Sequence, residues 1–209
     1  MWEYSVLRWI IENLQSPIVT EIMKIITLMG EGAGIFFLIS IIMLFWKKTR
    51  KAAIVSIIAL IFVSGFNNFV FKYLVARPRP FLHPELGGDA LWLNNHVLAF
   101  GAESKFNDFL VPSSYAFASG HTLSAFLFGF IVAYYHKKAA VPVLVFSSIM
   151  AFTRLYFGFH YPTDVIAGII WAFVASFALI ATADRHEQDI VAWFKKKSSK
   201  KPKPVEEEV

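Results

Sequence analysis

The sequence contains no cysteine and carries little charge. Among its 209 residues no cysteine occurs, and only 17% are Asp, Glu, Lys or Arg. Without cysteine there are no disulfide bonds, thiolate metal sites or cysteine nucleophiles. With 56% apolar residues and a mean hydropathy of +0.54, the chain is too apolar for a soluble domain and indicates an integral membrane protein. No cleavable signal peptide is expected, because the first residues lack a basic start.

The positive balance of the chain does not predict a nucleic-acid partner. The formal net charge is +5, but the basic residues cluster in short loops and in a tail beside apolar segments. The sequence also contains 22 Phe, 7 Tyr and 6 Trp, a composition typical of a lipid-facing bundle with aromatic rings at the membrane interface. We therefore expect the bilayer as the main partner, no nucleic acid and no obligate protein partner.

Hydrophobic periodicity divides the chain into three parts. Residues 1–16 alternate apolar and polar positions at helical spacing and predict an amphipathic, interfacial helix. Residues 17–184 predict a membrane-embedded helix bundle, and residues 185–209 a charged cytoplasmic tail. The pattern leaves open whether residues 17–46 form one helix or two. The clearest later apolar spans cover residues 52–75, 120–136, 139–157 and 162–183.

The distribution of basic residues predicts the orientation. The loops at 47–51 and 137–138 and the C-terminal tail carry most of the Lys and Arg, which places them in the cytoplasm. The polar loop at 77–118 and the stretch 154–164 then share the outer face. We expect a multi-pass protein of the plasma membrane whose site lies on that face. A loop as long as 77–118 is usually functional.

Three clusters of polar residues meet on this face, and together they resemble an anion site. Arginine binds phosphate oxygens in a bidentate way, lysine adds a point charge, and the start of a helix offers free N–H groups to an anion. A serine–glycine pair suits such a helix start. The candidate phosphate-binding residues are Lys72, Arg79, Ser119, Gly120 and Arg154, and the candidate catalytic residues are His121, His160 and Asp164.

The two histidines and the aspartate suit phosphoryl transfer. Pro162 is favourable in the first turn of a helix, so Asp164 would lie in that turn and reach back to His160. A histidine oriented in this way can attack phosphorus and form a phosphohistidine, while His121 protonates the leaving oxygen and later activates water. No acidic cluster suited to a magnesium ion accompanies them. We therefore expect no metal and no other cofactor.

These motifs resemble the type 2 phosphatidic acid phosphatase superfamily, the lipid phosphate phosphatases. The family pattern is Lys, six residues, Arg-Pro; then Pro-Ser-Gly-His; then Ser-Arg, five residues, His, three residues, Asp. The sequence matches at every residue that carries chemistry, but Ala118 replaces the proline and Thr153 replaces the first serine of the third motif. The resemblance covers about residues 20–183. It implies an all-α bundle of six transmembrane helices, with short helices in the outer loop.

The resemblance implies a phosphatase of membrane lipids. Within the family, the small size resembles bacterial enzymes of the phosphatidylglycerophosphatase B type, which convert phosphatidylglycerol phosphate to phosphatidylglycerol. Related enzymes hydrolyse undecaprenyl pyrophosphate in recycling of the cell-wall lipid carrier, and the motifs do not separate the two substrates. Two hypotheses of other classes stay open: a non-catalytic anion or lipid transporter that uses the same basic pocket, and a histidine-ligated haem or metal protein. The clustered cations argue against the metal, because like charges repel.

Overall fold

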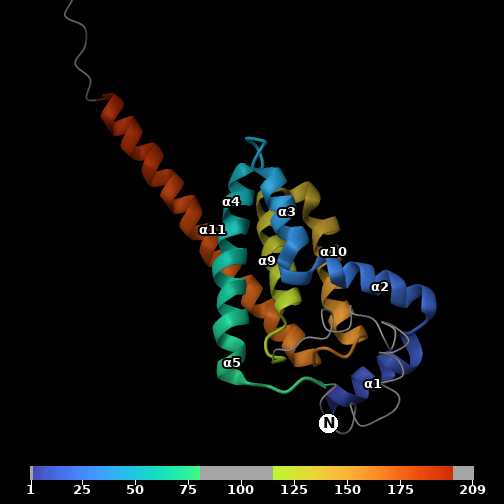
Figure 1. The fold of residues 1–209 in the computed structure, drawn as a ribbon. Coiled ribbons are helices and arrows are strands. Elements are labelled where there is room, and N and C mark those ends of the chain that lie inside the picture. The colour runs from blue at the N-terminus through green and yellow to red at the C-terminus, as the bar shows by residue number, and fades with distance from the viewer. Residues whose placement is uncertain (1, 81–114, 200–209) are drawn as a thin grey trace, which may run out of the picture.

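The chain folds into a bundle of packed helices, shown in a computed structural model in Figure 1. The structure describes residues 2–80 and 115–199, and within these ranges all regular secondary structure is helical. The all-α class predicted from the sequence is therefore confirmed. The predicted short helices of the outer loop fall mainly in residues 81–114, which lie outside the described residues, as do residues 200–209.

Three helical stretches of the described part are long and apolar enough to cross a membrane. They are Arg50–Val75, Lys137–Tyr156 and Pro162–Glu187. The pair Pro17–Met29 and Glu31–Met43 would make a fourth span, with a bend of 51° between its two pieces. These spans pack around the shorter apolar helix Gly120–Tyr135. The structure thus supports three or four spans by length and composition, and a total of six stays a prediction.

The N-terminal helix α1 (Trp2–Leu14) is amphipathic. Tyr4 and Leu7 on one face are buried, whereas Trp2 and Trp9 on the other are more than half exposed. The buried face packs against α10 and α11, the two helices that flank the loop before Pro162. In Figure 1, α1 lies beside the lower end of the bundle. This contact brings the first residues of the chain to the end of the bundle where α11 begins.

A sharp break separates α2 (Pro17–Met29) from α3 (Gly34–Met43). The Ser16 side chain caps the start of α2 by accepting a hydrogen bond from the backbone N–H of Val19, and proline follows the cap. The helix ends at Gly30, and a single 3₁₀ turn, η1 (Glu31–Ala33), follows. Within this turn Gly32 and Ala33 have φ angles of 56° and 61°, in the left-handed region that ends helical propagation. Residues 17–46 therefore form two helices, which resolves the alternative that the sequence left open.

The span Arg50–Val75 is continuous but contains two wide turns. Such π-helical turns insert one extra residue into a helix and are frequent at functional sites. The second turn carries Asn67, whose side-chain amide donates to the carbonyl of Ala118 over 3.2 Å. This bond joins the span to the segment just before α9. The pieces are α4 (Arg50–Ala59), η2 (Leu60–Ser64), η3 (Asn67–Phe71) and α5 (Lys72–Val75).

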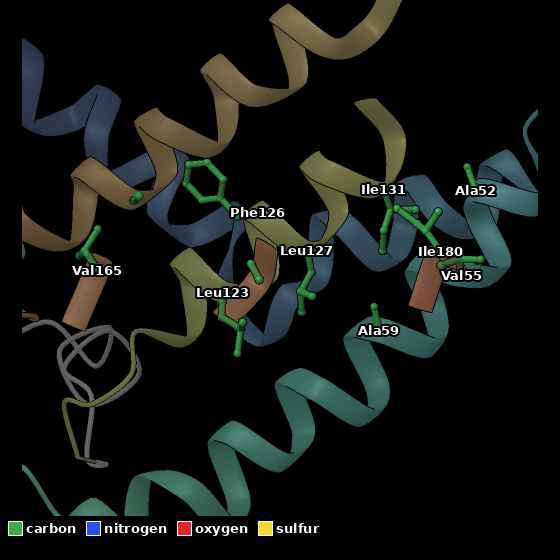
Figure 2. Packing of buried hydrophobic residues seen from close by; sticks show 11 residues of the cluster. Ala52, Val55, Ala59, Leu123, Phe126, Leu127, Ile131, Val165 and Ile180 are labelled. Carbon is green, nitrogen blue, oxygen red and sulfur yellow. The ribbon is translucent and has the colours of Figure 1, made fainter. Parts of the chain in front are cut away.

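The centre of the bundle is α9 (Gly120–Tyr135), which packs against α4, α10 and α11. Figure 2 shows Leu123, Leu127 and Ile131 of α9 among side chains of these neighbours. All three are completely buried. After α9, a short turn η5 (Lys137–Ala139) leads into α10 (Ala140–Tyr156), and α11 (Pro162–Ser199) follows.

Small residues allow α9 to approach its neighbours closely. A Cβ atom added at Gly129 would lie 2.7 Å from the Ser147 hydroxyl of α10, and one at Gly168 of α11 would lie 3.2 Å from the carbonyl oxygen of Ser119. The Ser147 hydroxyl also donates to the carbonyl of Ala125 over 2.8 Å. Lipid tails are as apolar as leucine, so close packing and interhelical hydrogen bonds hold membrane helices together. The contacts with Ser147 hold the middle of α9 against α10, and the contact at Gly168 holds the start of α9 against α11.

The end of the bundle away from α1 is held by an ion-pair network. Lys51 lies 2.7 Å from Asp184 and also pairs with Glu187, while the Tyr135 hydroxyl donates to Asp184 over 2.9 Å. Helix α11 continues past this network and extends away from the bundle in Figure 1. The boundary that the sequence suggested at residue 184 therefore lies within a continuous helix.

Candidate active site

The predicted site residues come together at one end of the bundle. This end contains the C-terminal ends of α5 and α10 and the first turns of α9 and α11 (lower end of the bundle in Figure 1). Lys72, Arg79 and Arg154 are each at least 95% buried, and all three act electrostatically on His160. His121 acts on the same imidazole. Three motifs that lie far apart in the sequence thus form one cationic cluster.

His160 lies between Arg79 and Asp164. The Nη1 atom of Arg79 is 2.8 Å from His160 Nε2 and also donates to the carbonyl of Phe159 over 2.9 Å. A guanidinium group has only N–H donors, so Nε2 must accept, which assigns the ring proton to Nδ1. Nδ1 lies 3.5 Å from Asp164 Oδ2, which is longer than a normal hydrogen bond, and it has no hydrogen-bond partner among the described residues. The imidazole is therefore oriented with its Nε2 lone pair toward the cations.

Burial and neighbouring charge keep His160 neutral. The side chain is 1% exposed. Burial lowers the pKa of His160 well below its ordinary value of 6.5, and the charges of Arg79, Arg154 and Lys72 lower it further. Burial also lowers the pKa of Arg79 to about 10, which still leaves it charged at neutral pH. The cluster consequently combines a neutral imidazole with positive charge on the neighbouring side chains.

Asp164 is completely buried in the first turn of α11. Its Oδ2 atom accepts a hydrogen bond from the backbone N–H of Tyr161 over 2.8 Å, and its Oδ1 atom accepts from Arg77 Nη1 over 2.6 Å. Pro162 is the first residue of the helix, as the sequence predicted. Asp164 therefore lies one turn after His160, in the position that a carboxylate needs to face the imidazole.

Arg154, near the end of α10, is held by Thr27 of α2. Arg154 Nη1 donates to the Thr27 hydroxyl, whereas Arg154 Nε is buried and has no hydrogen-bond partner among the described residues. An orphaned charged donor is costly unless a ligand satisfies it. Thr153 gives its hydroxyl to the carbonyl of Met150 over 2.7 Å and lies 3.2 Å from the Thr27 hydroxyl. Thr153 replaces the serine of the family pattern, and its hydroxyl makes contacts that a serine hydroxyl could also make.

The start of α9 has the geometry predicted for an anion site. Ser119 caps the helix: its side chain accepts from the backbone N–H and the hydroxyl of Thr122. A Cβ atom at Gly120 would lie 2.7 Å from Asn68 Oδ1, so only glycine lets α9 approach the wide turn of the neighbouring span without displacing Asn68. The first N–H groups of α9 lack intrahelical partners, as in any helix, and its dipole favours an anion there.

His121 is oriented by the break between α2 and α3. Its Nε2 atom lies 3.2 Å from the carbonyl oxygen of Thr27 and 3.5 Å from a carboxylate oxygen of Glu31. A backbone carbonyl only accepts, so Nε2 carries a proton. Gly30 is needed here, because a Cβ atom would lie 2.7 Å from the His121 ring. The Thr27 carbonyl therefore fixes the tautomer and the ring orientation of the second histidine.

Several residues of the site were missed by sequence reasoning. Arg77 is not part of any of the three motifs, but the structure places it between Asp164 and Glu3. Thr27 and Glu31 were not singled out at all. The glycines at 30, 32 and 34 mark a break in the helical pattern, and this break was the only local sign in the sequence that Glu31 has a special position. Among the described residues no three His, Asp or Glu side chains converge as a metal site requires.

Comparison with known proteins identifies the family. The PAP2 superfamily pattern matches residues 51–187. The chain belongs to the PAP2 superfamily, and the resemblance seen in the three motifs is confirmed. The catalytic candidates all lie in the matched region, whereas α1, α2 and α3 lie before it.

Individual relatives are more distant. The chain is 23% identical over 126 residues to "Undecaprenyl-diphosphatase BcrC" of Bacillus subtilis (strain 168), covering 58% of this chain and 55% of the relative. It is 33% identical over 70 residues to "Bacitracin transport permease protein BcrC" of Bacillus licheniformis, covering 34% of each. The matches thus span about half, or less, of these relatives.

A solved structure has the same fold. It is described as the first transmembrane PAP2 type phosphatidylglycerolphosphate phosphatase from Bacillus subtilis. The TM-score is 0.63 at 20% identity, and the likeness covers 88% of this chain and 85% of that one. At this identity the likeness shows the fold alone.

Proposed function

We propose that the protein is a metal-independent phosphatase that removes a terminal phosphate from a membrane lipid through a phosphohistidine intermediate. One observation supports this above all: the neutral, buried His160 directs a lone pair at Nε2 into a cluster of cations, while its other nitrogen faces Asp164. A protein that only binds an anion requires the cations but does not require an oriented nucleophile. Phosphoryl transfer needs both.

The proposed reaction has two steps. The phosphate binds between Arg79, Arg154 and Lys72, and Arg79 moves from His160 Nε2 to a phosphate oxygen. Nε2 then attacks phosphorus, and the P–N bond forms as the P–O bond to the lipid breaks. His121, which enters this step as an imidazolium, gives one proton to the departing oxygen and becomes neutral. In the second step His121 takes a proton from water, which attacks the phosphohistidine and releases orthophosphate. Asp164 stabilises the positive charge that develops on the imidazole in each step.

The same contacts support independence from metal ions. In phosphoryl-transfer enzymes, positive charge on the equatorial oxygens is supplied either by magnesium or by arginine and lysine side chains. Here three buried cations surround the nucleophile, and their charge disfavours a divalent cation at the same place. The proposal therefore assigns the charge stabilisation to side chains alone.

We propose phosphatidylglycerol phosphate as the substrate, with phosphatidylglycerol as the product. The fold match to the phosphatidylglycerolphosphate phosphatase of Bacillus subtilis supports this choice, because it covers most of both chains. A second candidate is undecaprenyl pyrophosphate, which the name of one relative favours. Both substrates present a terminal phosphate on a lipid, so the same nucleophile and cations serve either.

The site is proposed to face the outside of the plasma membrane. The basic loops at 47–51 and 137–138 connect α3 to α4 and α9 to α10, at the end of the bundle opposite the candidate site (Figure 1). Positive loops stay in the cytoplasm. A phosphatase in this orientation acts on lipids of the outer leaflet.

Phosphate release by the purified full chain tests the function. The substrates are phosphatidylglycerol phosphate, dioctanoyl phosphatidic acid and undecaprenyl pyrophosphate in detergent micelles, each with and without EDTA. We expect release that EDTA leaves unchanged and that vanadate, a mimic of five-coordinate phosphorus, inhibits. His160→Ala should abolish release, while His186→Ala, an exposed histidine on α11, should not.

The outcomes separate the hypotheses. Loss of activity in EDTA would contradict metal independence, and an active His160→Ala variant would contradict the phosphohistidine. Saturable binding of the lipids without any release would favour the non-catalytic transporter, a class that the name of one relative also suggests. The ranking of the three lipids by kcat/KM decides between the two proposed substrates.

A further inference from the structure

A partly buried ion-pair network connects the first turn of α1 to Asp164, the neighbour of the candidate nucleophile. Arg77 lies at its centre: Nη1 is 2.6 Å from Asp164 Oδ1, and Nη2 is 2.8 Å from Glu3 Oε2. The Thr163 hydroxyl joins both sides, since it lies 2.7 Å from Arg77 Nη1 and 2.6 Å from Glu3 Oε1. The guanidinium carbon of Arg77 lies 4.0 Å from the ring centroid of Tyr161. The planar fork of arginine suits this geometry, which lysine cannot reproduce.

Glu3 is itself held in place. Its side chain is 11% exposed, and a buried carboxylate is unfavourable unless it is paired. Burial raises the pKa of Glu3, but the hydrogen bonds from the hydroxyl and the backbone N–H of Thr163 and the charge of Arg77 outweigh it, so the net pKa is lowered. Glu3 therefore stays ionised, and Arg77 has a fixed partner on the side away from Asp164.

We propose that Arg77, anchored by Glu3, is a positioning residue that sets the orientation of Asp164 and through it that of His160. The inference rests on the proposed phosphatase function. Glu3 lies on α1, before the region 51–187 that matches the family. Under this proposal the N-terminal helix contributes a residue that supports the active site. The sequence assigned α1 only to the membrane interface.

The two oxygens of Asp164 have different tasks. Oδ2 accepts from the backbone of Tyr161 and faces His160, whereas Oδ1 depends on Arg77. Without Arg77, Oδ1 would be a buried charge without its ion-pair partner, and the carboxylate would rotate toward another donor or take up a proton. Either change withdraws the negatively charged oxygen that lies 3.5 Å from His160 Nδ1. The nucleophile would then lose its orientation while the phosphate-binding cations keep theirs.

This division predicts an effect on turnover rather than on binding. The Arg77 side chain makes its described contacts with Glu3, Tyr161, Thr163 and Asp164, and none of these residues is a cation of the phosphate site. Arg77→Gln should therefore lower kcat on dioctanoyl phosphatidic acid by roughly 10–100-fold, the range seen when a group that orients a metal-binding side chain is removed, which we apply to the carboxylate beside His160. KM should change by less than about twofold, since ground-state binding is retained.

The test uses a set of full-length variants with matched controls. Arg77→Lys keeps the charge but not the fork, so it should restore only part of kcat. Glu3→Gln should lower kcat less than Arg77→Gln, while Glu12→Gln, the same change on an exposed face of α1, should leave it unchanged. In an Asp164→Asn background, Arg77→Gln should have no further effect, because its action passes through Asp164.

The outcomes are distinguishable. A wild-type chain that hydrolyses no lipid phosphate contradicts the proposed function itself. An active wild type with unchanged kcat in both Arg77→Gln and Glu3→Gln overturns only the positioning role. A rise in KM that equals the fall in kcat would also overturn the positioning role. The same holds if Arg77→Gln lowers kcat as much in the Asp164→Asn background as in the wild type. Folding is checked by gel filtration, and if Arg77→Gln aggregates, unchanged kcat in Arg77→Lys and Glu3→Gln overturns the inference.

Discussion

Replacing Thr27 by valine removes one buried hydroxyl while keeping the shape of the side chain. That hydroxyl accepts a hydrogen bond from Arg154 Nη1, and Thr27 is 2% exposed. A hydrogen bond to a charged group is worth about 1.5–3 kcal/mol, and about 1.4 kcal/mol corresponds to a factor of ten in rate. Thr27→Val should therefore lower kcat/KM by roughly 10–150-fold.

The loss should appear mainly as weaker phosphate binding. The backbone carbonyl of Thr27, which accepts from His121, is unchanged by the substitution, so the proton donor keeps its position. Vanadate inhibition should weaken in parallel with kcat/KM, because both depend on Arg154. The assay is hydrolysis of dioctanoyl phosphatidic acid with a vanadate titration at each substrate concentration.

Thr27→Ser is the matched control. It keeps the hydroxyl and loses only a methyl group, so it should retain most of the activity. The reasoning is refuted if Thr27→Val keeps more than half of wild-type kcat/KM, which would mean that Arg154 needs no support from α2. Equal damage in Thr27→Ser would assign the effect to packing instead of to the hydroxyl.

Three further predictions follow from the site and the fold. Burial and nearby cations lower the pKa of His160, so His160 should stay neutral as the pH falls through 6.5. After correction for ionisation of the substrate phosphate, kcat/KM should therefore stay level through pH 6.5 and decline only below it. A decline centred at or above pH 6.5 contradicts this prediction. Gly120→Ala should raise KM, because its Cβ would lie 2.7 Å from Asn68 Oδ1, whereas Gly34→Ala, with no atom within 4 Å of its Cβ, should not. Lys51→Met should lower the free energy of unfolding by no more than about 1 kcal/mol, since the pair is partly exposed, with unchanged kcat; a large loss of activity would contradict its structural role.

Local signals in the sequence predicted the ends of the helices that form the site. Ser119 before an apolar run predicts a helix cap, and Pro162 predicts a helix start, because each satisfies a requirement of its own neighbourhood. The spacing from His160 to Asp164 then places a carboxylate one turn from an imidazole. These interactions span few residues, so the sequence alone was sufficient for them.

Contacts between distant segments could not be predicted in this way. Glu3 and Arg77 are 74 positions apart, and Thr27 and Arg154 are 127 apart. No periodicity connects such pairs, since their meeting depends on how α1 and α2 pack against α10 and α11. The direction of the bend after Gly30 was equally inaccessible: glycines indicate that a helix breaks, but the φ angles of Gly32 and Ala33 decide where the next helix points.

The part of the chain before the family match therefore contributes to the site in three places. Glu3 pairs with the arginine that holds Asp164, Thr27 accepts from Arg154, and Glu31 lies 3.5 Å from His121. Each contact gives a partner to a charged or polar side chain that belongs to the catalytic cluster or touches it. Most of these side chains are largely buried. A buried polar group that loses its partner retains its full desolvation cost, so the matched region without these helices would leave the cations and Asp164 undersatisfied. The unit that builds the site is consequently larger than the stretch that carries the three motifs, and it includes α1 and α2.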